Sequence, residues 1–151
     1  MERTCGNGTL RAIDAGKKVT LIGWVSKRRN LGSLVFIDLR DRTGTVQVTF
    51  DETMAEKVKD VRNEYILSVT GTVTLRKDAN PKMETGEIEI HCEDVTIVNS
   101  AETLPIDLSD NSTSSEDTRL KYRYLDLRRP SLQKNMILRH KICMIARNVL
   151  E

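Results

Sequence analysis

Features that define several protein classes are missing from this sequence of 151 residues. No apolar run approaches the roughly 20 residues that a membrane-spanning helix needs, and the first residues lack the apolar stretch of a secretory signal. The three cysteines, Cys5, Cys92 and Cys143, include no CxxC pair and have no histidine at metal-ligand spacing. We therefore expect a cytoplasmic protein with reduced thiols, no membrane contact and no metal site.

Catalytic motifs are missing as well. The sequence has no glycine-rich phosphate loop, no nucleophile elbow and no pair of carboxylates in an apolar context. His91 and His140 have no partners at triad or ligand spacing, so both are interpreted as structural. The chain is therefore predicted to bind rather than to catalyse, with no catalytic residue or cofactor of its own.

The net charge of +2 is too small to indicate a nucleic-acid partner by itself. The distribution of charge therefore has to be considered. Basic residues cluster at Lys27-Arg28-Arg29 and again between Arg119 and Arg129.

Between Lys18 and Val98 the sequence consists mostly of short alternating segments separated by turn residues. The pattern predicts strands at 19–25, 34–40, 45–50, 65–75 and 86–90, and an amphipathic helix at 52–62. Three strands, one helix and two strands follow the order of an OB-fold, the five-stranded Greek-key barrel with a helix between strands three and four. We predict this mainly β fold. A plain β-sandwich fragment is the alternative, but it does not account for the single helix.

The first predicted strand contains Gly23, which indicates a sharp bend or a bulge. Regular alternation would turn Trp24 outward, but a bend at Gly23 would disturb the alternation. We therefore expect Trp24 in the core.

The composition changes after Val98. A polar, serine-rich tract at 108–117 cannot bury a core and is interpreted as a linker. We expect an OB-fold domain at 1–99, a linker or hinge at 100–130, and the first helix of a truncated catalytic domain at 131–151. Ser131 is expected to cap that helix.

The predicted last helix carries an apolar stripe formed by Leu138, Ile142, Ile145 and Val149. No residue of the linker covers this stripe, and no Gly, Asn or Pro ends the helix before Glu151. We expect the chain to be the front of a longer protein, with the stripe packed against a missing domain or a second subunit. A protein-interaction module that uses the stripe is one alternative function.

Phe36 lies in the opposite phase to the apolar residues of its own strand. Alternation places Val35, Ile37 and Leu39 on the core side and turns Phe36 towards water. An exposed aromatic ring flanked by charge is a candidate platform for stacking a nucleobase. A ring covered by a loop or by a strand edge is the alternative.

Alternation on neighbouring strands adds polar side chains to the same outer face. Gln47 lies outward on the strand at 45–50, and Glu87 and Glu89 lie outward on the strand at 86–90. With a guanidinium from Arg28 or Arg29, this face offers an amide, carboxylates and a cation to base edges. Such groups read unstacked RNA bases. A solvated surface with structural ion pairs is the alternative for each residue taken alone.

Two stretches resemble the bacterial aspartyl-tRNA synthetase family. The first is Gly23-Trp24-Val25 followed by KRRNLGSLVFIDLRD at 27–41 and by Gln47 between two valines. The second, RLKYRYLDLRRP at 119–130, is similar to the segment that joins the anticodon-binding and catalytic domains of that family. The first stretch is shared with the lysyl and asparaginyl relatives, whereas the second favours the aspartyl enzymes. The resemblance covers essentially the whole chain.

The resemblance implies that the chain binds the anticodon loop of tRNA-Asp. Phe36 would stack on an anticodon base, Gln47 would bond the central uridine, and Arg29 and Glu89 would fix the neighbouring bases. Leu31 replaces a histidine of some relatives that also charge tRNA-Asn, which favours an enzyme specific for tRNA-Asp. The anticodon-binding residues implied in this way are Arg28, Arg29, Leu31, Phe36, Gln47, Asn80 and Glu89.

For the full-length enzyme the resemblance implies a class II homodimer that attaches L-aspartate to tRNA-Asp with ATP and Mg²⁺. The family motifs that bind ATP and aspartate are absent from this chain, which is therefore predicted to be inactive on its own and to hold no cofactor. The main alternative function is a free-standing OB-fold protein that binds single-stranded nucleic acid.

Overall fold

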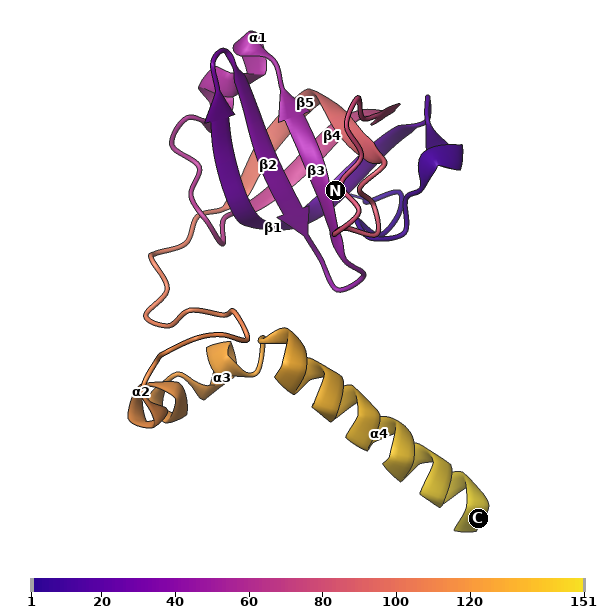
Figure 1. Ribbon diagram of the computed structural model, residues 1–151, viewed down its shortest axis with the longest axis vertical. Coiled ribbons are helices and arrows are strands. Elements are labelled where there is room, and N and C mark those ends of the chain that lie inside the picture. The colour runs from indigo at the N-terminus through magenta and orange to yellow at the C-terminus, as the bar shows by residue number, and fades with distance from the viewer. Residues whose placement is uncertain (1, 151) are drawn as a thin grey trace. The chain divides into compact units, whose positions relative to one another are not determined.

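The computed structural model of the chain describes residues 2–150 and contains two units, Met1–Glu102 and Thr103–Glu151. Five strands of the first unit form a closed barrel in the order β1-β2-β3-β5-β4, and Figure 1 shows them wrapping around a common interior. This order and closure confirm the predicted OB-fold. The strands are β1 (Lys18–Leu31), β2 (Leu34–Arg40), β3 (Thr45–Phe50), β4 (Ile66–Leu75) and β5 (Ile88–Asn99).

The barrel closes because β1 pairs with two neighbours. Its first half is antiparallel to β4 and its second half is antiparallel to β2. A register shift between Val25 and Lys27 bends the strand just after Gly23. A Cβ at Gly23 would lie 2.5 Å from the carbonyl oxygen of Arg40, so only glycine permits this close approach of the two strands.

Alternation on each strand fills the interior with apolar side chains. Leu21, Ile37, Val48, Val69 and Ile90, one from each strand, have no exposed surface. Val48 and Ile90 also belong to the short parallel pairing of β3 with β5. Burial of each such side chain contributes about 1.5–3 kcal/mol, and this burial fixes which side of each strand faces outward.

The prediction that Trp24 lies in the core is wrong, because its side chain is 38% exposed. The register shift comes after Val25, so the alternation continues unbroken through the glycine. Leu21, Gly23 and Val25 therefore face inward and Trp24 faces outward.

Two predicted elements have different lengths in the structure. The segment between β3 and β4 is helical as predicted, but it consists of α1 (Glu52–Ala55) and a 3₁₀ turn, η2 (Glu56–Val58). Val58 and Val61 are both buried, although Val61 lies beyond the helical turns. β5 extends to Asn99, well past the predicted 86–90, because it pairs with β4 along almost its whole length.

The turn between β2 and β3 is built around Asp41. Its carboxylate accepts hydrogen bonds from the hydroxyl and N–H of Thr43 and from the N–H groups of Gly44 and Asn7. Burial alone would raise the pKa of Asp41, but these hydrogen bonds lower it below its ordinary value. Through Asn7, Asp41 also fixes the N-terminal segment, which contains a 3₁₀ turn, η1 (Ala12–Asp14), against the barrel.

A buried carboxylate also organises the second unit. Asp126 has no exposed side-chain surface and accepts from Arg119 at 3.0 Å, from Arg123 at 2.9 Å and from Arg129 at 3.4 Å. Three arginines of the basic cluster between Arg119 and Arg129 therefore form ion pairs with this one aspartate. The helices of this unit are α2 (Glu116–Lys121), α3 (Arg123–Asp126) and α4 (Pro130–Leu150).

α4 begins at Pro130, so the prediction that Ser131 caps it is wrong. Proline suits the first helical position because the N–H that it lacks has no partner there. The N–H and hydroxyl of Ser131 donate instead to Oδ1 of Asp110, at 3.1 and 2.5 Å. No side chain of α4 is buried, the predicted stripe included, and the expected end of the helix at Glu151 lies outside the described residues.

Within residues 2–150, no helix combines the length and the apolar character needed to cross a membrane.

Replacing Asp41 by Asn removes the negative charge that the turn's donors surround. We expect Asp41→Asn to lower the free energy of unfolding by about 1–3 kcal/mol at neutral pH, because hydrogen bonds to a charged group are weakened. Urea unfolding followed by circular dichroism measures this change. Asp78→Asn is the matched control, since Asp78 is exposed on a loop.

The pKa of Asp41 is lowered in the folded state, so its contribution is complete above the ordinary carboxyl pKa of about 3.9. The contribution is lost as the pH falls through the lowered value. The difference in free energy of unfolding between the wild-type chain and Asp41→Asn should therefore disappear below about pH 4. A difference that stays constant with pH would contradict this role of the charge.

Asp126 gives a second pH-dependent prediction. The hydrogen bond from Arg119 lowers the pKa of Asp126, burial opposes this, and the bond from Arg129 lowers it further. Hydrogen-exchange protection of the α3 amides should persist at pH 5–7 and disappear as the pH falls below about 4. Asp126→Asn should lose this protection already at neutral pH, whereas Asp117→Asn, an exposed residue of α2, should keep it. Equal protection in all three proteins would contradict the organising role of Asp126.

Candidate functional site

Strand pairing places the predicted outward side chains in two adjacent rows. Phe36 on β2 lies between Arg29 on β1 and Thr49 on β3. Asp38, two residues further along β2, lies opposite Gln47 on β3. Residues directly opposite each other in antiparallel strands share a face. These five residues therefore form one continuous patch on the outside of the barrel.

A chain of hydrogen bonds runs through this patch and reaches β5. Nη2 of Arg29 donates to Oδ1 of Asp38 at 2.7 Å and to Oε1 of Gln47 at 3.1 Å. Nε2 of Gln47 donates to Oε2 of Glu89 at 2.9 Å, and the hydroxyl of Thr49 donates to the same Oε2 at 2.9 Å. We call Arg29, Asp38, Gln47, Thr49 and Glu89 the Gln47 network.

The network is less solvated than alternation predicts. Gln47 faces outward, but it is only 8% exposed, and Thr49 is also 8% exposed. Phe36 is partly buried rather than open to water. The cause is the neighbouring strands, whose charged side chains bond to Gln47 and cover it. The Arg29 side chain itself remains 40% exposed.

This arrangement suits recognition of unpaired bases. Phe36 supplies a ring, and stacking of a base on such a ring contributes about 1–3 kcal/mol. Arg29 supplies a guanidinium, and Glu89 supplies a carboxylate that accepts from base amino groups. A carboxylate repels phosphate, so its presence favours contact with base edges over contact with the backbone.

Two of the predicted site residues on the β1–β2 hairpin lie outside the network. Arg28 pairs with Ile37, so the register places it in the inward phase, away from Arg29 and Phe36. Leu31 is 67% exposed at the tip of the hairpin, next to Gly32, whose φ of +63° suits a two-residue turn. The structure therefore brings Arg29, but not Arg28 or Leu31, into the hydrogen-bonded network.

Asn80 also lies apart from the network, in the loop between β4 and β5. Its Oδ1 accepts from the N–H of Lys82 at 3.1 Å, and its backbone bonds both Met83 and Gly86. The loop is thus tightly folded on itself. Glu87, which alternation placed on the outer face, is exposed and is not part of the network.

Asp38 and Thr49 are the two network members that are not among the predicted site residues. The same alternation that identified Gln47 places Thr49 outward two residues later. The signal was therefore present, but a single threonine on a strand carries no chemical signature of binding. Only the position of Glu89 on another strand gives its hydroxyl a role.

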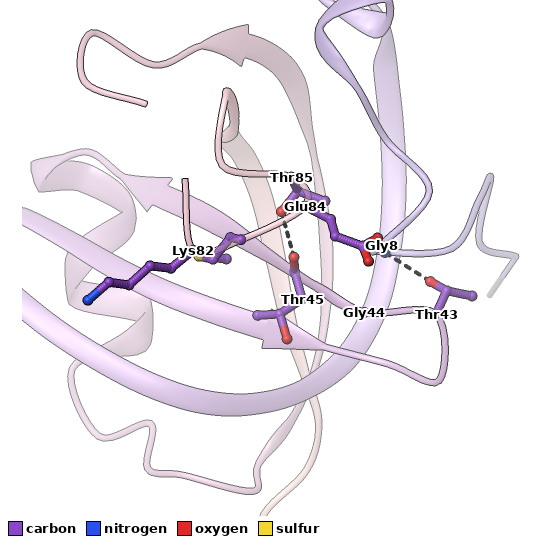
Figure 2. Close-up of a pocket in the computed structure, with 8 residues that line it drawn as sticks. Gly8, Thr43, Gly44, Thr45, Lys82, Glu84 and Thr85 are labelled. Carbon is purple, nitrogen blue, oxygen red and sulfur yellow. Dashed lines mark hydrogen bonds between the residues drawn. The ribbon is translucent and has the colours of Figure 1, made fainter. Parts of the chain in front are cut away.

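A concavity of about 290 Å³ lies elsewhere on the barrel, where the N-terminal segment, the β2–β3 turn and the β4–β5 loop meet (Figure 2). Gly8 donates to the Thr43 hydroxyl at 2.9 Å, and the Thr85 hydroxyl donates to the carbonyl of Thr45 at 2.6 Å. Figure 2 shows the Lys82 side chain extending away from the other lining residues. None of the predicted site residues lines this concavity. The bond from Thr85 holds the β4–β5 loop against β3, and the bond from Gly8 holds the N-terminal segment against the β2–β3 turn.

Two family models match the chain. The model described as an OB-fold nucleic acid binding domain, of the tRNA anticodon type, matches residues 19–98. The model of class II tRNA synthetases (D, K and N) matches residues 115–151. The first match covers the barrel and includes every strand of the candidate site.

Curated relatives are similar over nearly the whole chain. An aspartate–tRNA ligase of Ruminiclostridium cellulolyticum is 51% identical over 153 residues, covering 98% of this chain and 26% of that protein. An aspartate–tRNA(Asp/Asn) ligase of Caldanaerobacter subterraneus subsp. tengcongensis is 50% identical over 156 residues, covering 99% of this chain and 26% of that protein. The chain thus spans about a quarter of the length of the relatives it matches.

Solved structures agree on the fold. Asparaginyl-tRNA synthetase from Pyrococcus horikoshii, complexed with asparaginyl-adenylate, is 28% identical with a TM-score of 0.84, covering 99% of this chain and 34% of that one. Aspartyl-tRNA synthetase from Entamoeba histolytica superposes with a TM-score of 0.87 at 23% identity, covering 97% of this chain and 36% of that one. The second likeness is informative about fold alone.

Proposed function

Since this chain belongs to the family of OB-fold nucleic acid binding domains, we propose that its barrel recognises the anticodon of tRNA-Asp as the N-terminal part of an aspartate–tRNA ligase. The observation that carries the proposal is the Gln47 network beside the Phe36 ring. A protein that binds single strands without regard to sequence needs mainly rings and positive charge. This face instead combines one ring with an amide and a carboxylate held by hydrogen bonds.

The network supports base reading because it fixes the Gln47 amide. The Gln47 carbonyl accepts from the Arg29 cation and its NH₂ group donates to the Glu89 anion, so the amide cannot be reversed without loss of both bonds. An amide of fixed orientation presents a defined donor and acceptor to a base. We propose that this base is the central uridine of the anticodon, stacked near Phe36. Arg28, Leu31 and Asn80 remain proposed contacts from the neighbouring hairpin and loop.

The names of the relatives and their greater length extend the proposal to the full-length protein. That protein would be a cytoplasmic class II enzyme, a homodimer, that attaches L-aspartate to tRNA-Asp with ATP and Mg²⁺. The stripe of α4 would pack against a part of the enzyme outside this chain. This chain alone would bind the anticodon and would not aminoacylate.

Binding of the 151-residue chain to anticodon stem-loop RNAs tests the proposal. One RNA carries the aspartate anticodon GUC, and the other carries GCC, in which only the central uridine is replaced by cytidine. The replacement converts an acceptor at position 4 of the base into a donor, so a fixed amide cannot satisfy both bases. We expect the GUC loop to bind about 5- to 150-fold more tightly, equivalent to about 1–3 kcal/mol. Equal affinity for the two loops would contradict anticodon reading and favour a general single-strand binder.

Phe36→Ala tests the ring separately from the hydrogen bonds. We expect the affinity for the GUC loop to fall by about 1–3 kcal/mol, because one base loses its stacking partner. Isothermal titration calorimetry measures the affinity, and thermal unfolding of the same samples measures stability. Ile13→Ala, which removes a side chain 87% exposed in η1, is the control for the loss of surface apolar area. A large loss of stability with unchanged affinity would assign Phe36 to the core.

A further inference from the structure

The Gln47 network uses one oxygen of Glu89 and leaves the other unused. Oε2 accepts both the Gln47 amide and the Thr49 hydroxyl. Among residues 2–150, Oε1 of Glu89 has no hydrogen-bond donor. Because the side chain is partly exposed, this second oxygen is available to a donor outside the protein. Oε2 of Glu89 is therefore held by the protein, whereas Oε1 is left to accept a hydrogen bond from a ligand.

We propose that Thr49 is a positioning residue that determines base specificity, because its hydroxyl holds Oε2 of Glu89 and thereby aims Oε1 at the amino or imino group of an anticodon base. This inference rests on the proposed function and adds to it a residue that does not itself touch the RNA. Thr49 is only 8% exposed, so the Glu89 carboxylate that it holds, not its own hydroxyl, is presented to the base.

Thr49 is needed because the other donor to Oε2 of Glu89 is the Gln47 amide, which is also proposed to bond the RNA. The Gln47 amide donates to Glu89, and it is also the group proposed to bond the central base. Any adjustment of Gln47 on binding would release Glu89 if that were its only anchor. The Thr49 hydroxyl is an independent second anchor at 2.9 Å, on the same strand as Gln47 but two residues further along.

The position of Thr49 also connects the carboxylate to the stacking ring. Thr49 lies directly opposite Phe36 on β2 and beside His91 on β5. A base stacked on Phe36 therefore lies over the strand that carries both anchors of Glu89. Because β3 pairs with β2, a Glu89 carboxylate fixed to β3 is also fixed relative to the Phe36 ring. Recognition of adjacent bases in one loop requires such a fixed geometry.

Thr49→Val tests the proposal, because valine keeps the shape and the β-branching of threonine and removes only the hydroxyl. The 151-residue chain is titrated with the GUC stem-loop and with loops changed at the first or the third anticodon position. The measured quantity is the ratio of dissociation constants between each changed loop and GUC. We expect Thr49→Val to lower this ratio about two- to tenfold at one of the two positions, the factor that one hydrogen bond supplies.

Three readouts distinguish positioning from a general structural effect. Thr49→Ser retains the hydroxyl and should restore the wild-type ratio. The dependence of affinity on salt should be the same in all variants, because no phosphate contact is removed. Thr72→Val should leave the ratio unchanged, although it removes the same kind of bond, from Thr72 to Glu93 at 2.6 Å, between β4 and β5.

The outcomes separate this inference from the proposed function. If the wild-type chain does not distinguish GUC from GCC, both are overturned. If it distinguishes these two but not the loops changed at the first or the third position, only the role of Thr49 is overturned. If the wild-type chain distinguishes them and Thr49→Val does so equally well, anticodon reading stands and the role of Thr49 is overturned. Should Thr49→Val fail to fold, Thr49→Ala replaces it with the same expected loss, and an unchanged ratio in that variant overturns the role.

Discussion

The barrel depends on one long strand that pairs on both sides. β1 pairs first with β4 and then with β2, and the change of neighbour requires the two backbones to approach closely at Gly23. Once this strand is bent, the remaining strands complete a closed barrel, in which β3 and β5 meet in a short parallel pairing. The closed sheet gives every strand an unambiguous inside and outside, and the candidate site is a consequence of that division.

The outer patch shows how side chains on the surface of a barrel can present precise chemistry. Neighbouring strands supply the cation, the amide and the carboxylate, and the strand spacing of about 4.8 Å lets side chains on adjacent strands bond directly. Each charged group of the Gln47 network has at least one partner within the protein. The patch is therefore ordered before any ligand arrives, which reduces the entropy lost when a flexible partner binds.

The sequence predicted the fold and the outward phase of Phe36 and Gln47 because both follow from local alternation. It did not predict that Gln47 would be buried, because its cover comes from Arg29 and Glu89 on strands distant in sequence. Trp24 was misplaced because the bend at Gly23 was assumed to break the alternation, whereas the register shift follows Val25. The cluster around Asp126 was missed for a different reason, because its partners lie only three to seven residues away in the sequence. Arg119, Arg123 and Arg129 were interpreted as part of a basic surface, and the burial of Asp126 among them depends on how α2 and α3 pack.

The tip of the β1–β2 hairpin has a consequence for how such a protein can evolve. Leu31 protrudes beside Gly32 and contributes little to the core, while the two-residue turn fixes the register of the strands behind it. Substitutions at Leu31 can therefore change which groups of a ligand the hairpin contacts without altering the barrel. An inserted residue in the turn would instead displace Arg29 from Phe36. Natural variation in partner choice should therefore accumulate as replacements at the tip, with the length of the turn held constant.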